Sequence, residues 1–124
     1  MQTRPSRWFA AVLLCAGLGL APAPVRAHAI IVAATPAANA VLHAAATPVE
    51  LRFNSRIDKE RSRLTLLKPD GTALTLPIAA DNAPDTLVTR LTGLPPGRYR
   101  LRWQVLAIDG HITRGDIPFE VAAR

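Results

Sequence analysis

The sequence contains almost no sulfur. Its one cysteine, Cys15, and its one methionine, Met1, both lie within the first 27 residues. A chain that begins after residue 27 therefore has no disulfide, no thiolate or thioether metal ligand and no thiol nucleophile. It also lacks the short motifs of serine hydrolases, phosphate-binding loops and helical zinc proteases. These absences exclude the enzyme chemistries that such motifs indicate.

The first 27 residues have the layout of a secretory signal peptide. Two arginines precede an apolar stretch at 8–21, and small residues occupy the third-last and last positions before a cleavage point at Ala27. The apolar stretch is shorter than the roughly 20 residues of a membrane-spanning helix. It also continues past Cys15, which argues against lipoprotein processing there. We therefore expect residues 1–27 to be a cleaved signal peptide and the mature chain to be periplasmic.

The net charge of +6 overstates the basicity of the mature chain. Three of the 15 basic residues precede residue 28, which leaves 12 basic against 9 acidic residues, a net charge of +3. Because the basic residues are scattered along the expected strands, they do not indicate nucleic-acid binding. Residues 28–124 are long enough for one domain.

Alternating apolar and polar residues predict an all-β fold. The segment 98–108 alternates strictly and places two aromatic residues on its apolar face, which predicts a central core strand. No segment shows a sustained helical period, and proline or glycine occurs in most of the gaps. The expected strands are 28–35, 49–54, around 64–66, 73–76, 86–91, 98–108 and 117–121. About seven short strands predict a β-sandwich of Greek-key type.

The polar face of the 98–108 segment carries Arg98, Arg100 and Arg102. These arginines could bind an anionic partner, but the solvated face of a one-sided strand explains them more simply. Trp103 could stack on a ligand, but its register with Leu101 indicates a core position.

Four residues could hold a metal ion: His28, His43, Asp109 and His111. Cleavage after residue 27 would give His28 a free α-amine beside its imidazole, which together form a chelating pair. Asp109 and His111 are two residues apart, and on extended backbone such side chains point the same way. Gly110 between them lets the backbone bend. His43 lies in an alanine-rich loop and is interpreted as a surface residue.

An amine, two imidazoles and a carboxylate suit Cu(II) in a tetragonal plane, and zinc accepts the same atoms in a tetrahedron. Cu(I) prefers sulfur ligands, which residues 28–124 lack. A histidine after a cleavage point and an Asp-Gly-His turn are each common by themselves. The residues alone therefore leave two interpretations open, a metal site or two unrelated features.

Residues 28–124 resemble the CopC family of periplasmic copper-resistance proteins over essentially their whole length. The resemblance depends on the order and spacing of several short segments. These are His28-Ala29, Thr35-Pro36-Ala37, the segment 49–54, the segment 94–99 with Trp103, and Asp109-Gly110-His111 with Gly115 before Phe119.

The resemblance implies an immunoglobulin-like or cupredoxin-like Greek-key β-sandwich that binds copper without being a blue-copper electron carrier. It also implies one Cu(II) per chain, held by the amine and imidazole of His28 together with Asp109 and His111. Some family members carry a Cu(I) site on a methionine-rich loop. The corresponding stretch here, around 54–62, has no methionine, so we predict a Cu(II)-only protein.

The expected function is periplasmic copper binding, either as a buffer or for delivery to a membrane transporter. Family members work beside, or fused to, an inner-membrane copper transporter of the CopD type. Because the sequence ends at Arg124 without a transmembrane segment, we expect that partner to be a separate polypeptide. We further expect a monomer that does not bind nucleic acid and is not an enzyme.

Two other functions stay open. A histidine-brace copper oxidase, as in lytic polysaccharide monooxygenases, also uses an N-terminal histidine with a second histidine. Here Asp109 would occupy a coordination position, and 97 residues leave little room for substrate loops. The other alternative is a periplasmic interaction module without a metal, which a mature N-terminus elsewhere than His28 would favour.

Overall fold

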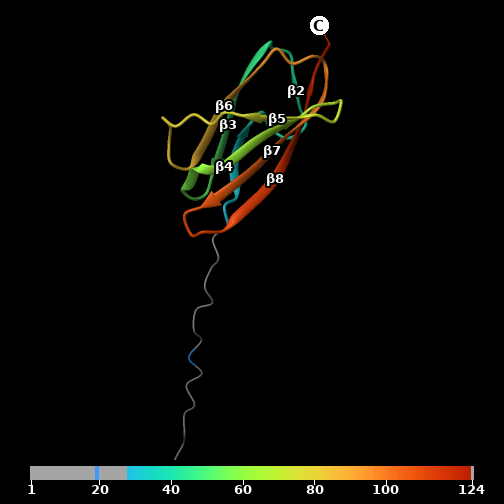
Figure 1. Cartoon of the computed structure of the whole chain (residues 1–124). Coiled ribbons are helices and arrows are strands. Elements are labelled where there is room, and N and C mark those ends of the chain that lie inside the picture. The colour runs from blue at the N-terminus through green and yellow to red at the C-terminus, as the bar shows by residue number, and fades with distance from the viewer. Residues whose placement is uncertain (1–18, 20–27, 124) are drawn as a thin grey trace, which may run out of the picture.

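Residues 28–123 form a two-layer β-sandwich (Figure 1). The computed structural model describes these residues and Gly19, so the expected signal peptide lies, apart from that glycine, outside the described residues. No helix in the described part of the chain could cross a membrane. The strands are β1 (Ile31–Thr35), β2 (Ala40–Leu42), β3 (Ala46–Phe53), β4 (Ile57–Leu67), β5 (Ala73–Leu76), β6 (Thr86–Thr92), β7 (Gly97–Ala107) and β8 (Ile112–Val121).

The strands divide into two sheets. One sheet has the order β1-β3-β6, and the other has the order β2-β8-β7-β4-β5. All neighbouring strands are antiparallel except β2 and β8, which run parallel. The chain alternates between the two sheets from β1 to β4, and it crosses to the three-stranded sheet once more at β6 and returns at β7. This arrangement confirms the predicted all-β sandwich, with eight strands where the sequence indicated about seven.

The core lies between the two sheets and follows the alternation of the sequence. In β7 the odd-numbered residues from Tyr99 to Ala107 are buried, whereas Arg98, Arg100 and Arg102 are exposed. Phe53 of β3 meets Trp103 of β7 edge-to-face, with ring centroids 5.3 Å apart, and so joins the two sheets. Burying a large apolar side chain contributes about 1.5–3 kcal/mol. The predicted core position of Trp103 is confirmed.

Several strand boundaries differ from the sequence-based expectation, since β1 begins at Ile31, β3 at Ala46 and β8 at Ile112, where starts at 28, 49 and 117 were expected. The other two differences concern β4 and β2. β4 begins at Ile57, whereas the sequence predicted a start near 64. The first part of this strand was missed because its pairing with β7 shifts in register between Asp58 and Arg63. The Ser62 hydroxyl donates to the Asp58 carbonyl at 2.6 Å within that irregularity, which interrupts the alternation that would identify a strand. The unpredicted β2 is a three-residue strand in an alanine-rich segment, too short to show a period.

The first described residues and the β7–β8 turn lie at the same end of the sandwich, and the C-terminus lies at the opposite end (Figure 1). His111 directly precedes β8, whereas His43 follows β2, whose last residue pairs with the last residue of β8. A strand of ten residues is about 33 Å long. His43 and His111 are therefore separated by roughly the length of the sandwich.

Candidate metal site

The structure brings His28, Asp109 and His111 to one end of the sandwich. The imidazole rings of His28 and His111 have centroids 5.6 Å apart and planes inclined by 80°. Oδ2 of Asp109 lies 3.1 Å from Nδ1 of His111. His28 comes from the segment before β1, and the other two come from the β7–β8 turn. Residues separated by about 80 positions in the sequence thus meet at a single place.

The loop between β3 and β4 positions both segments. The backbone N–H of Ile30 donates to Oδ1 of Asn54 at 2.9 Å, and the Asn54 N–H donates to the Ile30 carbonyl at 3.0 Å. The Ile108 N–H donates to the carbonyl of Arg56 at 3.1 Å. Ala29 is buried and anchors the chain directly after His28. The sequence analysis missed this role of Asn54 and Arg56, although Asn54 ends one of the segments quoted for the resemblance.

Asp109 and His111 converge through a turn and not through the extended backbone that the sequence analysis assumed. Oδ1 of Asp109 accepts a hydrogen bond from the backbone N–H of His111 at 3.0 Å, as in an Asx turn. Gly110 has φ of 85°, a conformation that glycine adopts without strain, and its N–H donates to the Ala107 carbonyl. The assumed geometry was wrong, but the two side chains do meet.

The surroundings of Asp109 favour its ionised form. The backbone N–H of His111 lowers the pKa of this carboxyl group most, and charges on His111 and His28 lower it further against the opposing effect of desolvation. Nδ1 of His111 is close to the carboxylate but not aligned for a hydrogen bond, and this buried atom has no hydrogen-bond partner among the described residues. A buried nitrogen without a hydrogen-bond partner, beside a carboxylate and a second imidazole, fits a metal ligand.

The donor groups would have to rearrange to share an ion. Within residues 28–123, no three His, Cys, Asp or Glu side chains already form a group that could hold a metal. The carboxylate of Asp109 faces His111, and the nitrogen of His28 is a peptide amide in the 124-residue chain. Removal of the preceding residues would convert that amide into an amine, which is a far better ligand.

His43 does not belong to this group. It lines a cavity of about 310 Å³ at the far end of the sandwich, together with Leu94, Pro96 and Val121. The structure therefore separates the one remaining histidine of residues 28–123 from the candidate site.

The fold and the candidate site define a β-sandwich with a cluster of two histidines and an aspartate at one end. The sequence pattern of the CopC domain matches residues 31–122. The chain is 32% identical over 123 residues to copper resistance protein C of Xanthomonas campestris pv. juglandis, which covers 93% of this chain and 96% of that protein. The crystal structure of CopC from Methylosinus trichosporium OB3b is also similar, with a TM-score of 0.68 and 28% identity over 76% of this chain and 93% of that one.

A third relative is the copper transport protein CutJ of Bacillus subtilis, 30% identical over 119 residues. That match covers 94% of this chain but only 22% of CutJ, so the chain spans about a fifth of that relative's length. Together these matches show that the chain belongs to the CopC family of copper-resistance proteins. Its function is related to copper.

Proposed function

We propose that the protein binds one Cu(II) ion in the periplasm through the amine and imidazole of His28, the carboxylate of Asp109 and the imidazole of His111. The observation that carries this proposal is the proximity of the two imidazole rings, 5.6 Å between centroids, with the Asp109 carboxylate 3.1 Å from His111. Family membership supports copper as the ion.

The oxidation state follows from the donor atoms. Nitrogen and oxygen ligands suit Cu(II), and residues 28–124 contain no thiolate or thioether that would favour Cu(I). The stretch around 54–62, which corresponds to the methionine-rich loop of some family members, contains the first part of β4 and has no methionine. Copper is the cargo here, bound and released by ligand exchange without turnover.

The proposed mature protein is the domain of residues 28–124, produced by cleavage after Ala27. It acts as a monomer that buffers Cu(II) or delivers it to a separate inner-membrane copper transporter of the CopD type. An open end of a sandwich suits such exchange, because the ligands come from the first residues and from a turn. Asp109 is exposed and His111 is partly exposed, so an acceptor can reach the ion.

A copper titration tests this function. Protein that begins at His28, confirmed by mass, is titrated with Cu(II) against a competing chelator beside protein with one extra residue before His28. One tight equivalent that the extra residue weakens sharply would establish the terminal amine as a ligand. Weak binding that does not change with the extension would overturn the proposed copper site.

A further inference from the structure

The outer face of the five-stranded sheet carries most of the net charge of the domain. The face has five arginines against three carboxylates, a net charge of +2. From residue 28 on, the other positions hold seven basic and six acidic residues, a net charge of +1. The charged residues of the face lie on β4, β7 and β8. They are Asp58, Arg63, Arg98, Arg100, Arg102, Arg114, Asp116 and Glu120.

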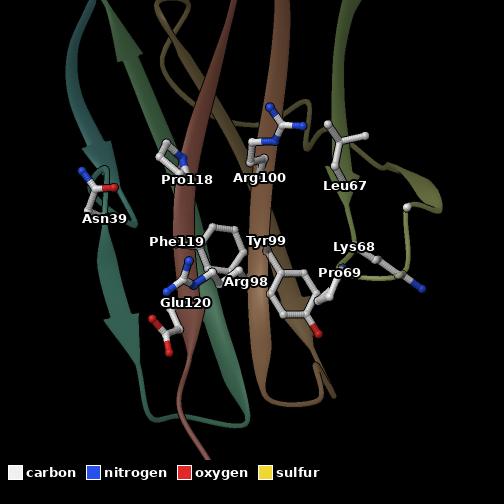
Figure 2. Close-up of a pocket in the computed structure, with 11 residues that line it drawn as sticks. Asn39, Leu67, Lys68, Pro69, Arg98, Tyr99, Arg100, Pro118, Phe119 and Glu120 are labelled. Carbon is white, nitrogen blue, oxygen red and sulfur yellow. The ribbon is translucent and has the colours of Figure 1, made fainter.

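Much of this positive charge is not neutralised internally. Arg100 and Arg102 share the single carboxylate of Asp116. Within the part of the chain that the structure describes, Arg63 and Arg98 form no ion pair. Arg98 and Arg100 also line a hollow of about 640 Å³ with Lys68 and Glu120, and Figure 2 shows them beside Pro118 and Glu120 of β8. This face can therefore attract an anionic surface.

The end of the same face nearest the candidate metal site is mainly apolar, and the one carboxylate there, Asp58 opposite Leu106, is paired with Arg61. Leu106 of β7 and Ile112 of β8 are direct partners across the sheet, and Ile112 is 55% exposed. Ile108 follows β7 directly and is 71% exposed, the highest value among the exposed large apolar side chains of the described residues. These isoleucines are the sequence neighbours of Asp109 and His111. Exposed apolar residues grouped in this way indicate a contact surface.

We propose that this face docks on an anionic phospholipid membrane, with Ile108 and Ile112 entering the interface and the arginines contacting the headgroups. The arrangement of the residues favours a membrane over an acidic protein. A protein interface usually has an apolar centre inside a polar rim. Here the apolar residues form one tip and the charge extends along the strands to one side, which is the order of polarity across a lipid interface.

Such docking would hold the Asp109–His111 turn against the bilayer. The idea that this orientation helps to pass copper to a membrane transporter rests on the proposed function. The docking itself does not rest on that function, because the arginines and isoleucines that would contact the membrane are separate from the proposed copper ligands. The two proposals can therefore fail independently.

Vesicle sedimentation tests the electrostatic part with metal-free protein that begins at His28 and contains the whole described sandwich. We expect binding to phosphatidylglycerol–phosphatidylethanolamine vesicles that weakens at high salt, and little binding to phosphatidylcholine vesicles. Replacing Arg98 and Arg114 by glutamine should weaken binding by about fivefold for each residue. The matched control is Arg52→Gln with Arg90→Gln, which removes the same charge from exposed positions on the three-stranded sheet. If the two double variants lose vesicle binding to the same extent, docking by this face is overturned.

The apolar part is tested by Ile108→Ser with Ile112→Ser, which should weaken vesicle binding by about tenfold. Val41→Ser, at an exposed position near the far end of the same sheet, should have little effect. If vesicles do not bind but poly-glutamate does, the membrane proposal is overturned in favour of an acidic protein partner. A copper titration of the same samples separates the two proposals, because vesicle binding without copper binding would overturn only the copper site.

Discussion

Gly115 of β8 lies directly against the indole of Trp103, its partner across the sheet in β7. A Cβ atom at residue 115 would lie 2.5 Å from Cζ2 of Trp103, which is closer than two carbon atoms can approach. The indole also packs on Phe53 of the opposite sheet, so it has little freedom to move aside. The space that Trp103 occupies therefore exists because residue 115 has no side chain.

Gly115→Ala should lower the free energy of unfolding by about 1–3 kcal/mol, because the added methyl group overpacks the core. Urea denaturation followed by circular dichroism measures the change, since it does not depend on Trp103. In a Trp103→Phe background the smaller ring leaves room, so the cost of Gly115→Ala should fall. A wild-type unfolding midpoint for Gly115→Ala would contradict the close contact.

Alanine substitutions test the proposed copper ligands. His111→Ala should weaken Cu(II) binding by more than the 10–100-fold that substitution of residues around a metal's ligands usually costs, and Asp109→Ala should weaken it to a smaller extent. A chelator-competition titration gives both values, and circular dichroism checks the fold. His43→Ala is the control, since His43 lies at the far end of β8. If His43→Ala lowers copper affinity as much as His111→Ala does, the assigned site is wrong.

The hydroxyl of Tyr99 donates a hydrogen bond to the carbonyl of Pro95 at 2.6 Å. Tyr99→Phe keeps the ring, which stacks on Phe119, but leaves that carbonyl without its donor. We expect a loss of about 1 kcal/mol in the free energy of unfolding at neutral pH. Urea denaturation of both proteins measures it, and no change would show that water replaces the hydroxyl at no cost.

The same residue makes stability depend on alkaline pH. Burial first, and the charge of Asp70 second, raise the pKa of Tyr99 above its ordinary value near 10. The unfolded chain therefore loses this proton at a lower pH than the folded chain, so stability is full below about pH 10 and falls as the pH rises further. Tyr99 is the only tyrosine, so no other phenol titrates in this range. The free energy of unfolding of wild type should therefore exceed that of Tyr99→Phe by less and less above about pH 10. A difference in the free energy of unfolding that stays the same across the pH series would contradict the raised pKa of Tyr99.

The ion pair between Asp116 and Arg102 predicts how the stability of the fold changes at acidic pH. Oδ1 and Oδ2 of Asp116 accept hydrogen bonds from Nε and Nη2 of Arg102 at 2.8 and 3.0 Å. Arg102 thereby lowers the pKa of Asp116, against partial desolvation. A lowered folded pKa stabilises the protein above the ordinary pKa near 4, and this contribution is lost as the pH falls through the folded value.

Asp116→Asn should therefore be less stable than wild type at neutral pH, and the difference should disappear in acid. Urea midpoints measured over a pH series test this expectation. Asp81→Asn is the control for removing a carboxylate, since Asp81 forms no ion pair within residues 28–123. The same pH-dependent difference in both variants would show that overall charge, and not the Arg102 pair, is responsible.

The sequence predicted best those strands in which one face is buried and the other is exposed to solvent. β5 matches its predicted bounds, and β6 and β7 match within one residue, because apolar and polar residues alternate in them or turn residues mark their ends. β8 was predicted only over its last part, since its first half has an exposed Ile112 and the side-chain-free Gly115 on the core face. The start of β4 was hidden by a register shift, which no period can show.

The candidate site was predictable in its residues but not in its geometry. Donor chemistry and the family resemblance named His28, Asp109 and His111, and the fold places them together. The Asx turn at Asp109 depends on a local hydrogen bond, and the anchoring by Asn54 and Arg56 depends on contacts between distant segments. Local patterns carry no record of such contacts.

The placement of the two chain ends has a practical consequence. The candidate site is at the end where the described chain begins, whereas residue 123 lies at the other end, about 30 Å away along β8 (Figure 1). A fluorophore, an affinity resin or a fused reporter attached after residue 123 would face away from the histidine cluster. The same attachment before His28 would cover that cluster. If the proposed Cu(II) site is correct, this sandwich can be immobilised by its tail as a copper probe with its binding end open to the solution.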